Sequence, residues 1–159
     1  MENIQSFLLL LIANASPVIA CYLLGGKAAW RVDAGRTFID HQPLFGESKT
    51  WRGIIAATVS TWGLALALGY SGELGIKFAA WAMFGDLLSS FSKRRLRIPP
   101  SGRMTGVDQI PESLLPLLFL RKELELGFSE IAMVVVAFVL FAEGLSGLRH
   151  RWESRKRSH

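Results

Sequence analysis

Cysteine and histidine are scarce in this chain, and their scarcity excludes several kinds of site. Cys21 is the only cysteine among 159 residues, so no internal disulfide can form, and its apolar surroundings predict that it packs as a small hydrophobe. The three histidines form no HExxH motif and no Cys/His spacing, which argues against a zinc site. His41 is the only histidine near the polar clusters described below.

Charge is also scarce, because charged residues make up 19% of the chain and hydrophobic residues 50%. This balance is typical of a small polytopic membrane protein, and we expect one membrane domain over residues 1–159. The net charge is +5, but the basic residues lie in short loops between apolar runs rather than on one soluble face. An anionic membrane surface and an anionic substrate explain them better than nucleic acid, which is not expected as a partner.

Hydrophobic runs cover most of the remaining sequence. They span residues 5–24, 53–70, 74–92, 107–120 and 128–148. Most approach the roughly 20 residues that cross a bilayer, so we predict an all-α integral membrane protein with about five transmembrane helices and two cytoplasmic polar loops that form the site. The fourth run is short and contains Pro111 and Pro116, which predicts either a helix sheltered by its neighbours or a partly re-entrant segment.

Positive charge predicts the orientation. All but three of the 18 Lys and Arg residues lie in loop 25–52, in loop 93–106 or in the tail 149–159. The exceptions are Lys77, Arg121 and Lys122. By the positive-inside rule the N-terminus is outside, and both long loops and the tail are in the cytoplasm of a multi-pass cell-membrane protein. No Lys or Arg precedes the first run, so we expect a retained helix rather than a cleaved leader.

Two carboxylates flank a strongly basic segment. Asp86 lies inside the third run and Asp108 at the mouth of the fourth. The cations between them are Lys93, Arg94, Arg95, Arg97 and Arg103. Carboxylates at membrane depth are costly and usually functional, so this pair predicts a Mg²⁺ site with counter-charges for a phosphate-bearing substrate. The alternative is an ion pair of Asp86 with a lysine or arginine that locks helices together, although buried pairs stabilise poorly.

Helical spacing groups these residues further. On a helix, Asp86 and Lys93 share one face, and Asp108 and Glu112 repeat the i, i+4 pattern on the next segment. Glu112 either joins the site or is a charge at its rim. In the first run, Asn14 and Pro17 interrupt the leucines, and they either shape a pocket or hold helices together.

A second polar cluster occupies loop 25–52. Its members are Asp33, Arg36, Asp40, Lys49, Thr50 and Arg52, interleaved with Gly35, Gly46 and Gly53. Glycines let backbone amides approach phosphate oxygens, and lysine and arginine neutralise them. The cluster is not a P-loop, because Ser48 stands where the second glycine of GxxxxGK[ST] would be and no parallel-sheet pattern surrounds it. The alternative is a solvated basic loop that touches lipid headgroups.

Taken together, these motifs resemble the CDP-archaeol synthase family, whose chemistry is similar to that of the CDP-diacylglycerol synthases. The matching pieces are Asn14-Ala-Ser-Pro17, Asp33-x-Gly35-Arg36-x-Phe38-x-Asp40, Phe45-Gly46-x-x-Lys49-Thr50-x-Arg52-Gly53, and Gly85-Asp86-x-x-x-Ser90-Phe91-x-Lys93-Arg94-Arg95 with Asp108-Gln109 beyond. They cover all but the last third of the chain. The family usually has lysine where this chain has Arg36, so the charge is kept but the geometry is not.

The resemblance implies transfer of a cytidylyl group from CTP to a membrane lipid phosphate, which gives a CDP-lipid and pyrophosphate. On that basis we assign Asp86 and Asp108 to Mg²⁺ and Lys93 to the triphosphate, and we expect these three residues to be catalytic. The predicted phosphate ligands are Arg94 and Arg95 for the triphosphate, Lys49, Thr50 and Arg52 for either substrate, and Arg36. Asp33 and Asp40 orient the loop or hold a second metal, and Asn14 lies near the cytidine or the pocket wall.

Two other classes of function remain as alternatives. A non-catalytic transporter or lipid-translocating protein would use Asp86 and Asp108 as an ion path and would not bind CTP. A structural membrane subunit would use its basic tail to bind anionic lipid. The ether or ester type of the lipid phosphate and the oligomeric state, with a homo-oligomer among the options, stay open.

Overall fold

The computed structural model describes residues 2–157 apart from 99–108, with side-chain surroundings up to residue 145. Its helices are α1 (Glu2–Leu24), α2 (Trp51–Ala67), α3 (Gly72–Arg95), α4 (Gln109–Phe119) and α5 (Phe128–Arg157). Each predicted apolar run forms one helix, so the prediction of an all-α fold is confirmed. The described residues contain no strand, but isolated antiparallel bridges join Arg31 to Thr50 and Thr37 to Pro43 within the first long loop.

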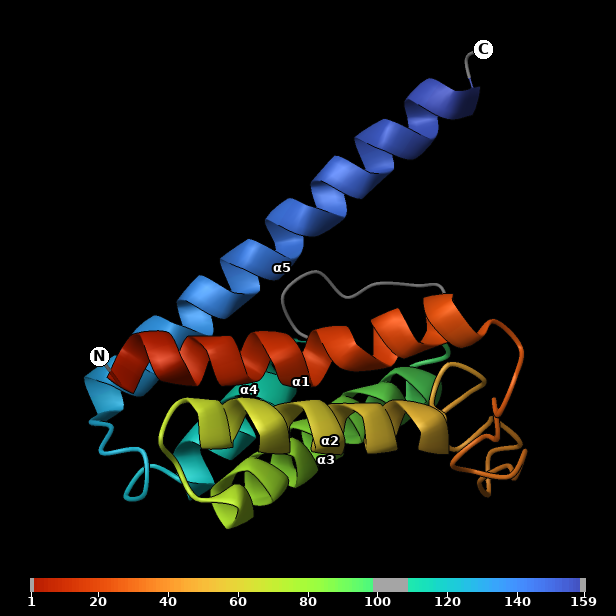
Figure 1. Ribbon diagram of the computed structural model, residues 1–159. Helices are drawn as coiled ribbons and strands as arrows, with labels where there is room; N and C mark the ends of the chain where they lie inside the picture. Colours follow the sequence, from red (N-terminus) through yellow and green to blue (C-terminus); the bar gives the residue numbers. More distant parts are fainter. Residues whose placement is uncertain (1, 99–108, 158–159) are drawn as a thin grey trace.

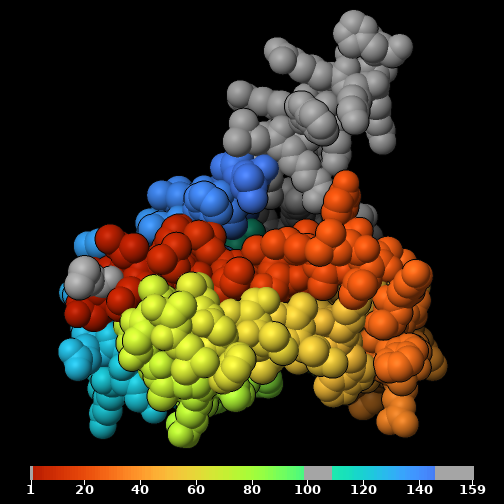
Figure 2. Space-filling view, viewed as in Figure 1, coloured from red at the N-terminus to blue at the C-terminus, as the bar shows by residue number. Residues whose placement is uncertain are grey.

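The first three helices lie side by side and alternate in direction (Figure 1). Helix α2 packs against both α1 and α3, and α4 packs against α3. Helix α5 packs against α4 and α1 and then leaves the bundle at an oblique angle. Figure 2 shows α1 and α2 in contact along their length, with loop 25–50 gathered at one end. The C-terminal end of α3 lies at that same end, so the two long polar segments meet there.

Side-chain size divides the interior into two parts. The larger core cluster contains Leu9 and Leu10 of α1, Phe78 of α3 and Leu117 of α4. The smaller cluster consists of Ala13, Ala57, Ala82 and Met83. It lies nearer the long loops, where alanines let three helices approach closely. Large side chains therefore fill one end of the bundle, and small ones leave room at the end that carries the polar loops.

Helix α4 is too short to cross a membrane alone. Its 11 residues extend over about 16 Å at 1.5 Å per residue, against a hydrocarbon core of about 30 Å. Its buried residues are Ser113, Pro116 and Leu117. This arrangement matches the prediction of a segment sheltered by its neighbours. By length and composition, α1 and residues Phe128–Leu145 of α5 are apolar enough to span a bilayer.

Candidate active site

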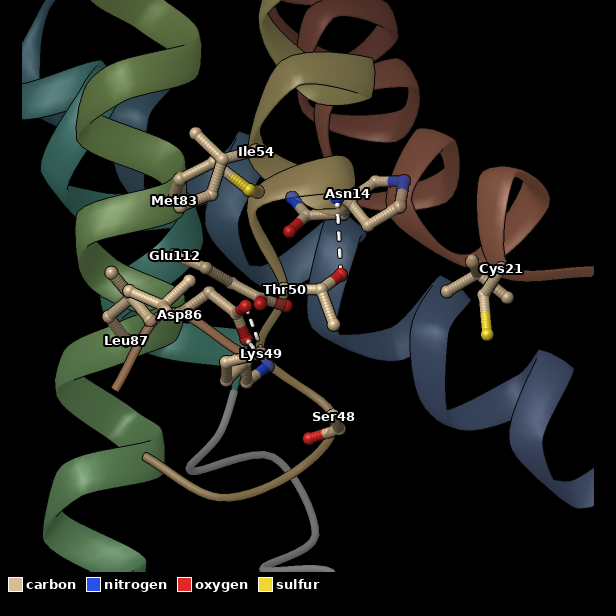
Figure 3. Close-up of a pocket in the computed structure, with 14 residues that line it drawn as sticks. Asn14, Cys21, Ser48, Lys49, Thr50, Ile54, Met83, Asp86, Leu87 and Glu112 are labelled. Carbon is tan, nitrogen blue, oxygen red and sulfur yellow. Dashed lines mark hydrogen bonds and ion pairs between the residues drawn. The ribbon is translucent and has the colours of Figure 1, made fainter. Parts of the chain in front are cut away.

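A cavity of about 590 Å³ lies where loop 25–50 meets the bundle. Helices α1 to α4 and the end of the loop all contribute to its wall (Figure 3). Five predicted site residues line it, namely Asn14, Lys49, Thr50, Asp86 and Glu112. The rest of the wall is largely apolar, with Pro17, Val18, Cys21, Val32, Ile54, Met83 and Leu87, together with Ser48 and Gly53. The cavity thus joins a charged end to an apolar wall.

Lys49 and Asp86 form the charged centre of the cavity. The Nζ atom of Lys49 lies 2.6 Å from both Oδ1 and Oδ2 of Asp86. Their side chains are 21% and 24% exposed, so both open onto the cavity while the protein shields them from bulk solvent. From the sequence, Lys49 was assigned to phosphate and Asp86 to Mg²⁺, but their contact across 37 positions was not predicted.

Thr50 is the N-cap residue of α2 and lies at the edge of the cavity. Its backbone is extended, and its Oγ1 accepts a hydrogen bond of 3.3 Å from the N–H of Gly53. This N-cap satisfies one of the backbone N–H groups that have no partner within the first turn of a helix. The positive end of the α2 dipole therefore lies at the cavity, where it favours an anion beside the Lys49 ammonium.

Glu112 reaches the cavity because α3 and α4 approach each other to backbone contact. A Cβ atom added to Gly85 would lie 2.3 Å from the Pro111 carbonyl oxygen and 2.7 Å from Cα of Glu112. Only glycine fits at this crossing. Gly85 precedes Asp86, so the same contact brings two carboxylates to one cavity. This places Glu112 at the site, in favour of the first of its two interpretations.

Asn14 and Pro17 form the α1 side of the cavity. The side-chain Nδ2 of Asn14 donates to the Leu10 carbonyl of its own helix at 3.0 Å, rather than to another helix. Pro17 lies so close to α2 that a Cβ atom added to Gly53 would be 3.2 Å from the Cβ of Pro17. Asn14 and Pro17 both line the cavity, and Pro17 also packs α1 against α2, so both interpretations of the motif stay open.

Asp33 organises the inside of the long loop. It is 5% exposed, and its carboxylate accepts hydrogen bonds from the N–H groups of Gly35, Phe45 and Gly46 at 2.9 to 3.2 Å. Burial by itself raises the pKa of Asp33, but these three hydrogen bonds and the nearby Arg31 charge outweigh it, so the pKa lies below its ordinary value. Asp33 orients the loop, which is one of the two roles predicted for it.

The lowered pKa makes loop stability depend on pH. Stabilisation by Asp33 is complete above the ordinary value of 3.8 and is lost as the pH falls through the lowered folded-state value. Asparagine keeps one acceptor oxygen, so we expect Asp33→Asn to leave at least one of the three N–H groups without a partner, which costs roughly 1–3 kcal/mol locally. In this variant, amide hydrogen exchange at residues 35–46 should be faster at neutral pH than in the unaltered protein. The exchange rate should also change less as the pH is lowered, because the titrating carboxylate is gone. Glu47→Gln, at an exposed carboxylate of the same loop, should leave exchange unchanged.

Other predicted phosphate ligands lie outside the cavity wall. Arg52 is buried, and its Nη1 donates to the carbonyls of Gly25 and Lys27 at 2.8 and 2.5 Å, so it ties the start of the loop to α2. Arg95 pairs with Asp40. Arg36 is exposed on the loop. The predictions of direct phosphate contact by Arg36, Arg52 and Arg95 therefore find no support in the cavity geometry.

The basic residues Lys93 and Arg94 at the end of α3 also lie outside the cavity wall. Arg94 is 4% exposed and Lys93 is partly buried, and neither lines the cavity wall. Asp108 lies outside the described residues, so the predicted pairing of Asp86 with Asp108 stays a prediction. Within residues 2–98 and 109–145, no three His, Cys, Asp or Glu side chains group around one point.

The cavity also includes residues that the sequence analysis did not select. Cys21 is exposed and lies in the largely apolar part of the cavity wall, where the expected packing as a small hydrophobe stays a prediction. Met83 lies three residues before Asp86 on α3, and this helical spacing is the signal that would have identified it. Leu87 follows Asp86 directly, so helical spacing gives no such signal for it. Ser48 precedes Lys49, and only the fold shows that it reaches the cavity.

Comparisons with known proteins agree with this architecture. A family model described as CarS-like CDP-archaeol synthase matches residues 2–72. A solved structure of an intramembrane enzyme for archaeal membrane lipid biosynthesis superposes with a TM-score of 0.72 at 27% identity. The match covers 91% of this chain and 92% of that one.

Relatives of similar length share the sequence as well as the fold. The CDP-archaeol synthase of Pyrococcus furiosus is 32% identical over 154 residues, which cover 89% of each chain. That of Thermococcus onnurineus is 34% identical over 155 residues, covering 89% of this chain and 88% of the relative. Similarity of this extent decides against the transporter and structural-subunit alternatives. The chain belongs to the CDP-archaeol synthase family and is a membrane enzyme of the cytidylyltransferase class.

Proposed function

We propose that this enzyme transfers the cytidylyl group of CTP to the phosphate of an archaeal-type ether phosphatidate, with Mg²⁺ as its cofactor. The observation that carries the proposal is a single cavity in which the Lys49–Asp86 pair, Glu112 and the N-terminus of α2 adjoin an apolar wall. A polar phosphate and an apolar chain can meet there. The names of the relatives support CTP chemistry and an ether lipid.

The reaction does not require a protein base. The second pKa of a phosphate monoester is near 6, so the lipid phosphate is mostly ionised at neutral pH. One of its oxygens attacks the α-phosphorus of CTP, a new P–O bond forms, and the bond to the β-phosphate oxygen breaks to release pyrophosphate. The protein must hold two polyanions together and stabilise the charge between them.

The cavity residues divide this work between them. Lys49 and the N-terminus of α2 at Thr50 neutralise phosphate oxygens, and Lys93 and Arg94 add positive potential from the end of α3. Asp86 and Glu112 would hold Mg²⁺ together with substrate phosphates and water, the donor set that this ion prefers. The site suits a cation, because both Asp86 oxygens already contact the Lys49 ammonium. When bound, Mg²⁺ would neutralise charge on the triphosphate. Asp108 stays a proposed further ligand.

The apolar wall supports entry of the lipid from the bilayer. Val18 and Cys21 of α1 and Leu87 of α3 line it, and α1 is long and apolar enough to span a membrane. The positive-inside rule supports an orientation in which this end of the bundle faces the cytoplasm, where CTP is available. The headgroup can therefore reach the charged centre while the chains stay in lipid.

The proposal is tested by CTP-dependent pyrophosphate release from purified protein in detergent with Mg²⁺. We expect release with unsaturated ether phosphatidate and much slower release with ester phosphatidate of similar chain length. Chelation with EDTA should stop the reaction, and added Mg²⁺ should restore it. Equal rates on both lipids would overturn the ether preference, and no release on either lipid would overturn the proposed function.

A further inference from the structure

Loop 25–50 engages both terminal nitrogens of the Arg95 guanidinium, while its buried Nε has no hydrogen-bond partner among the described residues. Its Nη1 lies 2.8 Å from Oδ1 of Asp40. Its Nη2 donates to the carbonyl oxygens of Pro43 at 2.7 Å and Gln42 at 3.3 Å. The side chain is 21% exposed. The last turn of α3 is therefore attached to the tip of the loop by three separate acceptors.

Aromatic rings complete this attachment. The Arg95 guanidinium carbon lies 4.8 Å from the ring centroids of both Phe38 in the loop and Phe91 in α3. These rings pack edge to face with centroids 5.4 Å apart, and Phe45 adds a second loop ring against Phe91 at 6.5 Å. A guanidinium between two ring faces gains cation–π attraction. The cluster joins residues that are about fifty positions apart in sequence.

Arg95 lies nine residues after Asp86 on α3, which is about 13 Å along a helix. The loop consequently contacts α3 at two points, through Lys49 at Asp86 and through Asp40, Gln42 and Pro43 at Arg95. Two contacts fix both the position and the angle of the loop on the helix. We infer that Arg95 is a positioning residue that clamps loop 25–50 onto α3 and so delivers Lys49 to Asp86, rather than a ligand of the triphosphate.

This inference rests on the proposed function for its kinetic consequence, and its structural consequence is independent of it. A lysine at position 95 keeps the positive charge but has neither the planar fork that reaches several acceptors nor the flat face that stacks on rings. A triphosphate ligand would tolerate the change to lysine better than a clamp would. The clamp and the triphosphate-ligand interpretations therefore differ most in the result that they predict for Arg95→Lys.

Hydrogen exchange of substrate-free protein is the first measurement. We expect Arg95→Lys, Arg95→Gln and Asp40→Asn to speed exchange at residues 31–50 by roughly 10-fold, since the clamp is lost, with unchanged exchange in α2 and α5 as the check of folding. Arg121→Lys is the matched control, because Arg121 also lies over a ring, that of Phe128, at 4.6 Å but far from the loop. Unchanged loop exchange in the Arg95 variants would overturn the clamp whether or not the protein releases pyrophosphate.

Kinetics provide the second measurement. We expect Arg95→Lys and Arg95→Gln to lower kcat by similar factors of roughly 10 with less than about 3-fold change in KM for CTP, because a displaced Lys49 affects the reacting geometry. The double variant Arg95→Gln with Asp40→Asn should be no worse than Arg95→Gln. A raised KM for CTP that lysine rescues would assign Arg95 to the triphosphate and overturn the inference. Absence of activity in the unaltered protein would instead count against the proposed function.

Discussion

Replacing Asp86 with asparagine is expected to lower CTP-dependent pyrophosphate release by at least about 100-fold. The change keeps the size of the side chain but removes the negative charge that faces Lys49 at 2.6 Å. It leaves the ammonium without its counter-ion and removes one carboxylate from the proposed Mg²⁺ site. The measurement is the initial rate at saturating CTP and lipid, with folding followed by thermal unfolding in detergent.

Glu73→Gln is the matched control for this prediction. Glu73 is another carboxylate of α3, and it pairs with Lys77 at 2.7 Å, on the side of the bundle away from the cavity. We expect Glu73→Gln to keep the rate within about 2-fold, since exposed ion pairs contribute little. A well-folded Asp86→Asn protein with a similar rate would show that Asp86 takes no part in the reaction.

The alternative that Asp86 only locks helices together makes a different prediction for a double variant. If the pair is structural, Lys49→Met combined with Asp86→Asn removes both charges and should restore much of what the single change loses. If both side chains act on substrate phosphates and metal, the double variant stays inactive. Rate and unfolding temperature together distinguish these cases, because a structural loss lowers both and a catalytic loss lowers only the rate.

The helices could be predicted from the sequence because their cause is local. A run of apolar residues such as 128–148 must form a helix if it lies in lipid, where each backbone group needs an internal partner. The end of a helix is less determined. The helical backbone of α5 continues through the basic tail to Arg157, nine residues beyond the predicted run.

The site could be predicted in part because charge at membrane depth is rare. Asp86 was selected for that reason, Lys49 was selected as a cation among the glycines of the loop, and both line the cavity. The roles of the arginines could not be predicted, because an arginine suits a phosphate, a carboxylate and a row of carbonyls equally well. Arg52 donates hydrogen bonds to the carbonyls of Gly25 and Lys27. Only the path of the loop determines that it binds these carbonyls rather than a phosphate or a carboxylate.

The second large effect is expected at Gly85, whose role also depends on tertiary contact. A Cβ at this position would lie 2.3 Å from the Pro111 carbonyl oxygen, where ordinary contacts begin at 3.4 Å. The obstacle is backbone and cannot rotate away, so in Gly85→Ala the start of α4 must move by about 1 Å. Displacements of that size at an active site can cost about 100-fold in rate, and overpacking costs roughly 1–3 kcal/mol of stability.

Gly63→Ala separates this steric effect from the general consequences of replacing a helical glycine. A Cβ at Gly63 in α2 meets nothing within 4 Å, and alanine favours a helix over glycine by roughly 1 kcal/mol. We therefore expect Gly63→Ala to raise the unfolding temperature and keep the rate, whereas Gly85→Ala lowers both. Full activity of Gly85→Ala would mean that α4 can withdraw from α3 without disturbing the reaction. In that case Glu112 would not belong to the proposed metal site, and the carboxylate chemistry of the cavity would rest on Asp86 within the described residues.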